Sequence, residues 1–108
     1  MATNISLKNM DNLRDLIVDI NKYLDTDNNK SGTSIISDLT VKISDKVNKA
    51  SIIDDTYRVD NDIAYSILAF LSFVQTFFAS RIKATHYKDP EAVKIYWDAV
   101  ALKDYFRT

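Results

Sequence analysis

Residues 63–80 read IAYSILAFLSFVQTFFAS, a run without charged side chains that carries four of the five phenylalanines of the chain. As an α-helix rising 1.5 Å per residue, it would be about 27 Å long, close to the thickness of the hydrocarbon core of a bilayer. The first question is therefore whether this helix spans a membrane or forms the centre of a bundle of helices.

A helical wheel at about 100° per residue separates this segment into two faces. One face holds large apolar residues: Ile63, Ile67, Phe70, Leu71, Val74, Phe77, Phe78 and Ile82. The other face holds smaller or more polar residues: Tyr65, Ser66, Ala69, Ser72, Thr76, Ser80 and Lys83. A single span surrounded by lipid has no reason to keep a polar stripe, whereas a helix with one face near water does. We therefore expect a core helix and no membrane span.

The composition is that of one ordinary globular domain over residues 1–108. Hydrophobic residues make up 46% of the chain and charged residues 27%, and the net charge of −1 provides no bulk attraction for nucleic acid. The absence of cysteine excludes disulfides and thiol catalysis. The first residues show no basic region followed by an apolar one, so we expect no signal peptide and a cytoplasmic protein.

One glycine and one proline in 108 residues leave little material for turns and hairpins. Apolar residues recur at helical spacing over residues 7–24, over a second stripe from Ile36 to Ala50, over the central segment as far as Ala84, and over residues 90–106. The sequence thus predicts an all-α protein, an antiparallel four-helix bundle in which the third helix is the most buried.

The connections between these helices are polar. Residues 25–34, DTDNNKSGTS, are expected to be a solvated loop, because they lack the ligand ladder and the closing Glu of an EF-hand calcium loop. The Asp-rich residues 53–60 are expected to be a turn. Helix N-caps are expected at Ser6 or Asn9, at Asp60 or Asp62, and at Asp89, where Pro90 takes the first helical position.

The last helix carries two apolar sectors on nearly opposite sides. One contains Val93, Tyr96, Trp97, Val100 and Ala101, and the other contains Ile95, Ala99, Leu102 and Phe106. One sector can pack on the central helix, and the other needs either a deep central helix or a partner surface. We select as candidate partner-binding residues Ile95, Tyr96, Trp97, Leu102 and Phe106.

Motifs for nucleotide binding, nucleophilic catalysis or multi-His metal binding are missing from the sequence, and no cofactor or metal is expected. One constellation remains. Arg81-Ile-Lys-Ala-Thr-His86 resembles the motif of HEPN ribonucleases, although Tyr87 follows His86 directly where the common toxin form places tyrosine one residue later. The resemblance implies that Arg81 would bind the scissile phosphate and His86 would take part in acid–base cleavage. The alternative is that both are polar residues that end a helix.

The layout of the whole chain resembles the cytosolic immunity proteins of pediocin-like bacteriocins. The shared features are the length, the four-helix order, the polar loop after the first helix, and Ala69-Phe-Leu-Ser-Phe73 in an apolar third helix before a charged fourth one. The resemblance implies a protein without catalysis that protects its producer by engaging the bacteriocin-bound receptor from inside, with specificity in its C-terminal half.

Three functions follow as hypotheses. The leading one is a non-enzymatic helical protein that acts by binding another protein, with immunity-type protection as its most concrete form. The second is a HEPN-like ribonuclease or toxin that uses Arg81 and His86. The third is a structural subunit of a virus or accessory element that self-associates through the last helix.

Overall fold

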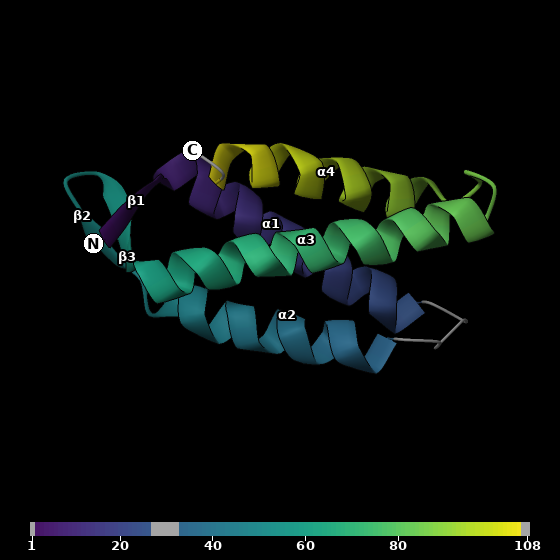
Figure 1. The fold of residues 1–108 in the computed structure, drawn as a ribbon, viewed down its shortest axis with the longest axis horizontal. Coiled ribbons are helices and arrows are strands. Elements are labelled where there is room, and N and C mark those ends of the chain that lie inside the picture. The colour runs from purple at the N-terminus through teal and green to yellow at the C-terminus, as the bar shows by residue number, and fades with distance from the viewer. Residues whose placement is uncertain (1, 27–32, 107–108) are drawn as a thin grey trace.

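The computed structural model describes residues 2–26 and 33–106, which form four α-helices and a three-stranded sheet (Figure 1). The elements in chain order are β1 (Ala2–Ser6), α1 (Leu7–Thr26), α2 (Thr33–Asn48), β2 (Ser51–Ile53), β3 (Thr56–Asp60), α3 (Asn61–Ala84) and α4 (Pro90–Phe106). Successive helices run in opposite directions, and α1 and α3 each pack against both α2 and α4. The prediction of a mostly helical chain with four helices is confirmed.

The helices begin where side chains cap them. The hydroxyl of Ser6 accepts a hydrogen bond from the backbone N–H of Asn9 at 3.1 Å, at the start of α1. The carboxylate of Asp60 accepts from the N–H of Ile63 at 2.9 Å, at the start of α3. Each bond satisfies a backbone donor that the helix itself leaves unpaired. Of the predicted alternatives, Ser6 and not Asn9 caps α1, and Asp60 and not Asp62 caps α3.

The prediction of an all-α fold holds only in part, because residues 51–60 form a β-hairpin and not a turn alone. Asp54 and Asp55 connect β2 to β3, and their φ angles are 53° and 62°. Two consecutive left-handed residues are what a type I′ turn requires, and Asp tolerates this region better than most residues. The hairpin therefore needs no glycine, which is why the scarcity of glycine was misleading.

The sheet closes one end of the helical bundle (Figure 1). Its strand order is β1-β3-β2, all antiparallel, with Ile5 opposite Tyr57 in the β1–β3 pair. Ile5, Tyr57 and Val59 are buried, as the two-residue period of a strand with one covered face requires. The guanidinium of Arg14 in α1 donates to the Tyr57 hydroxyl at 2.8 Å and lies 4.9 Å from the centre of its ring. These contacts fix the sheet to α1.

The core runs through all four helices and the sheet. Phe78 of α3 is fully buried and meets Tyr23 of α1 edge to face, with the ring centres 5.0 Å apart. The prediction that the third helix is the most buried is not met. Seven of the 24 residues of α3 are buried, a share similar to six of 20 in α1, because α3 also turns a polar face outward.

Among the described residues, α3 is the one helix long and apolar enough to cross a membrane, by length and composition. The mean hydropathy of its most apolar 18-residue window is 1.6, and 28% of that window is buried within the structure. The core helix of a soluble protein meets the same criteria of length and composition, but such a helix is mostly buried, whereas most of this window is not. Tyr65, on the polar stripe, is 72% exposed.

The expected polar loop, residues 25–34, overlaps the described helices at its ends. Asp25 and Thr26 belong to α1, while Thr33 and Ser34 begin α2. Its remaining residues, 27–32, lie outside the described part of the chain.

The left-handed turn of the hairpin gives a first prediction. Replacing Asp54-Asp55 by Asn-Gly should raise the free energy of unfolding by about 1 kcal/mol, since Asn-Gly is the preferred type I′ pair. Urea unfolding followed by circular dichroism measures the change. Asp55→Val is the matched control and should lower stability by about 1–2 kcal/mol, because a β-branched residue is disfavoured at positive φ. If both variants match the parent protein, the connection is not a left-handed turn.

Candidate protein-binding surface

The connection from α3 to α4 is built as a helix C-terminal motif. The N–H of Tyr87 donates to the carbonyl of Ile82 at 3.0 Å, and the N–H of His86 donates to that of Lys83 at 3.3 Å. This is the hydrogen-bond pattern of a Schellman motif, in which the residue after the C-cap adopts a left-handed conformation. His86 has a φ of 54° and so occupies the position that glycine usually fills.

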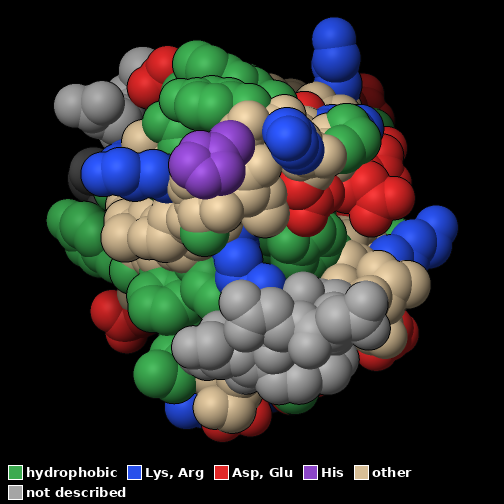
Figure 2. Space-filling model, turned by 90° about the vertical axis from the view of Figure 1, so that its right-hand side faces the viewer, with side chains coloured by type: hydrophobic (Ala, Val, Ile, Leu, Met, Phe, Trp, Pro, Cys, Tyr) green, Lys and Arg blue, Asp and Glu red, His purple; other side chains and the backbone are tan. Residues whose placement is uncertain are grey.

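Arg81 and His86 lie in different environments. Arg81 is 8% exposed, and its guanidinium carbon lies 5.1 Å from the ring centre of Phe77. His86, the one histidine of the chain, is exposed at the end of the molecule shown in Figure 2. A phosphate group in solution would have to displace the packing around Arg81 to reach its charge. The geometry therefore favours helix termination over phosphate binding for this pair.

The start of α4 is fixed by Asp89. One oxygen of its carboxylate accepts from the backbone N–H of Ala92 at 3.3 Å, and the other accepts from the Tyr23 hydroxyl at 2.8 Å. The predicted cap is confirmed, and Pro90 is the first residue of α4 as expected. The same carboxylate thus ends the loop, starts the helix and ties it to α1.

The predicted partner-binding residues are divided by the structure. Ile95 is 2% exposed and Leu102 is 5% exposed, so both belong to the core, and Phe106 is partly buried against it. None of the three offers a full side-chain surface to a partner while the helices stay packed. Tyr96 is half-buried, and Trp97 is 61% exposed. The sector that contains Trp97 is the one left without a complete cover.

Polar contacts on both flanks hold α4 in one orientation. Toward α1, the Lys94 ammonium lies 2.9 Å from the Asp98 carboxylate and 3.0 Å from that of Asp19. Hydrogen bonds to Asp98 and then to Asp19 raise the pKa of Lys94, because both carboxylates stabilise its protonated form. Toward α3, Lys103 donates to the side-chain oxygen of Gln75 at 3.3 Å.

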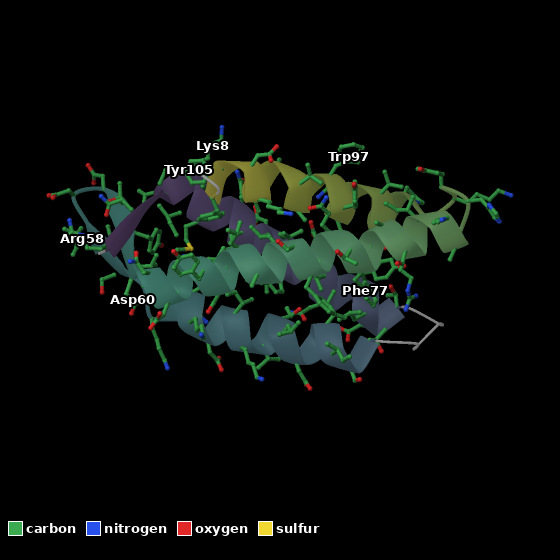
Figure 3. The ribbon with its side chains drawn as sticks, in the orientation of Figure 1. Lys8, Arg58, Asp60, Phe77, Trp97 and Tyr105 are labelled. Atoms are coloured by element: carbon green, nitrogen blue, oxygen red, sulfur yellow. The ribbon has the colours of Figure 1, made fainter. Side chains whose placement is uncertain are left out.

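The face of α4 between these flanks is the α4 outer surface, defined here as Val93, Tyr96, Trp97 and Val100. Trp97 projects away from the other helices (Figure 3). Its ring meets that of Tyr96 edge to face, with centres 5.1 Å apart. Val93 and Val100 are half-exposed beside them. An exposed indole therefore sits on a small apolar patch whose backbone is held on two sides.

A hollow of about 310 Å³ adjoins this surface between α3 and α4, lined by Gln75, Thr76, Ala79, Ser80, Lys83 and Tyr96. Thr76, Ser80 and Lys83 belong to the polar stripe of α3, which the sequence analysis interpreted only as a face near water. Small side chains leave space beside Tyr96 that a partner's side chain can fill. The pairing of this stripe with Tyr96 depends on how the two helices pack, so no motif in the sequence signals it.

Within residues 2–26 and 33–106, no three His, Asp or Glu side chains come together as metal ligands. Comparisons of the chain with protein-family models, curated proteins and solved structures found no match.

The conformation of His86 gives a second prediction. His86→Gly should raise the free energy of unfolding by about 1 kcal/mol, because glycine adopts positive φ without a steric penalty. Lys83→Gly, within the last turn of α3, is the control and should lower it by about 1 kcal/mol. Thermal unfolding measures both. A destabilised His86→Gly variant would show that the imidazole makes a contact that outweighs the backbone strain.

Proposed function

We propose that this chain is a small non-enzymatic helical protein that acts by binding another protein through the α4 outer surface. The observation that carries the proposal is Trp97, 61% exposed on a helix whose opposite side is in the core. Tryptophan and tyrosine are the residues most enriched at the energetic centres of protein interfaces. When a partner covers an exposed indole, its apolar surface leaves water and the free energy of the complex is lowered.

The surroundings of Trp97 suit this role. Because α4 is held by Asp89 at its start and by Lys94 and Lys103 on its flanks, little conformational freedom remains to be lost on binding. The hollow beside Tyr96 offers a recess next to a protruding ring, the combination that gives shape complementarity. The helix thus presents a preformed surface.

Site-specific photo-crosslinking tests this proposal. A photoreactive amino acid replaces Trp97 in the producing cell, and its crosslinked products are identified by mass spectrometry. We expect a discrete product from position 97. The same amino acid at Val41 of α2, which is 58% exposed on another face, is the matched control and should yield none of that product.

Two variants separate a binding role from general stickiness. In competition with the crosslinking protein, Trp97→Ala should compete at least about tenfold less well than the parent, as loss of a central aromatic residue requires. Tyr65→Ala removes another aromatic ring, 72% exposed on α3, and should compete fully. Equal competition by both variants would refute the proposed location. If the product is a second copy of this chain, and sedimentation shows a dimer that Trp97→Ala dissolves, the function is self-assembly instead.

The most concrete form of the proposal is immunity-type protection against a pediocin-like bacteriocin. It is supported by the four helices of alternating direction, the apolar α3 and the position of Trp97 in the C-terminal half. The sheet at the end of the bundle is not part of what that resemblance implied.

Expression in a bacteriocin-sensitive strain tests this form. Cells that produce the chain should need a higher concentration of at least one bacteriocin of a pediocin-like panel for growth inhibition. Trp97→Ala should reduce the protection, and Tyr65→Ala should retain it. Unchanged sensitivity to the whole panel, with the chain abundant in the cells, would rule out immunity and leave the binding proposal to the crosslinking experiment.

A further inference from the structure

A second concave surface lies between α2 and α3, on a different face from the α4 outer surface. This groove has a volume of about 370 Å³, within the range of ligand sites. Its apolar walls come from Leu39 and Ile43 of α2 and from Phe70 and Phe73 of α3. Ala69 and Ser66 are the small residues of α3 that keep it open.

Among the described residues that line the groove, the charged ones are both lysines. Lys42 and Lys46 stand on the α2 side, one helical turn apart, and Lys46 donates to the Ser66 hydroxyl at 3.0 Å. The acidic residues of the same helix, Asp38 and Asp45, do not line it. The groove therefore joins an apolar floor to a local basic edge, in a chain whose net charge is −1.

We propose that this groove binds an acidic amphipathic helix of another protein. Two parallel ridges of side chains with an apolar floor form the receptor surface of helix-in-groove recognition. Lys42 and Lys46 are four residues apart on one face of α2, so they match two acidic residues at the same spacing on a bound helix.

Further apolar side chains lie beyond the groove, at the end near the start of α2. Ile35 precedes Leu39 by one turn on α2 and is 56% exposed. Phe77 continues the α3 wall beyond Phe73 and lies toward α2 (Figure 3). A bound helix would therefore place apolar residues near the start of α2 and acidic residues near its end. This polarity sets the direction of the bound helix.

A membrane surface fits these observations less well than a helix does. The apolar residues line a concavity, whereas insertion into a bilayer requires apolar side chains that protrude beyond their charged neighbours. Two lysines also provide weaker attraction to anionic lipid than the clusters of four to eight that mark such sites. The concave shape is what selects a helical partner.

A synthetic helix is the probe for this proposal. It is an 18-residue, fluorescein-labelled peptide with leucines on one stripe and two glutamates four residues apart along one edge. A second peptide carries glutamine at those two positions. Fluorescence anisotropy with the full chain should give at least about fivefold tighter binding of the glutamate peptide, as two partly desolvated ion pairs provide.

Protein variants locate the binding. Lys42→Gln with Lys46→Gln should abolish the difference between the peptides, while Lys8→Gln with Lys22→Gln removes the same charge from α1 and should keep it. Ala69 is exposed, so the indole of an Ala69→Trp variant should fill the groove without disturbing the core. The affinity for both peptides should then fall about tenfold or more by steric exclusion. Circular dichroism confirms that each variant is folded. Chemical-shift changes at Ser66 and Ala69 report occupancy directly.

The outcomes that overturn the proposal are distinct. If the parent protein binds both peptides with equal affinity, the groove lysines do not select acidic residues. The same conclusion follows if the control variant, Lys8→Gln with Lys22→Gln, loses the difference between the peptides as fully as the groove variant does. Binding to phosphatidylglycerol vesicles that requires Lys42 and Lys46, with no peptide binding, would assign the groove to lipid. Trp97→Ala should bind the peptides like the parent protein. The proposal for the groove and the proposal for the α4 outer surface are therefore tested independently of each other.

Discussion

Tyr23 is the point on which the arrangement of the helices depends. Its ring, on α1, packs edge to face on Phe78 of α3, and its hydroxyl donates to the Asp89 carboxylate that caps α4. One side chain therefore joins three helices by two kinds of interaction. The apolar contact sets the distance across the bundle, and the hydrogen bond sets where the last helix begins. Since the carboxylate is also a cap, its position is specified by local and distant partners together.

The opposite end of α1 is anchored by the sheet. Arg14 contacts Tyr57 of β3, and Ile5 of β1, opposite Tyr57, is fully buried. A helix fixed at both ends in this way sets the frame into which α2, α3 and α4 pack. The apolar segment of residues 63–80 contributes Ile67, Phe70, Leu71, Val74 and Phe78 to the core, but α1 connects the parts. Because α1 sets the positions of the other helices, α3 can keep one polar face exposed and still pack in a defined position.

Local patterns predicted the four helices and the starts of α1, α3 and α4. The three- and four-residue spacing of apolar residues identified all four helices, and the dipeptide Asp89-Pro90 marked the start of α4. The sheet was missed because its evidence is not local. β1 pairs with β3 across about fifty residues, and β2 is a three-residue strand whose side chains are all exposed, so it shows no alternating pattern. Asp54-Asp55 lies in the predicted Asp-rich turn, but the strands that this left-handed turn connects were not predicted.

The candidate sites show the same division between pattern and packing. The two apolar sectors of α4 are visible in the sequence, but the sequence does not show which of them the neighbouring helices cover. Ile95 and Leu102 were therefore selected together with Trp97 as candidate partner-binding residues, although they belong to the core. The α2–α3 groove was not predicted at all, since it needs lysines of one helix to face the phenylalanines of another.

Net charge hides this local order. The net charge of −1 is the sum of distinct regions: the basic edge of the α2–α3 groove and, between α1 and α4, a hollow lined by Asp15, Asp19 and Asp98 together with Lys94. Within a screening length of about 8 Å, a partner responds to the local charge and not to the sum. Such separation gives a nearly neutral protein an orientation preference in its encounters, which is the property that selective binding on more than one face requires.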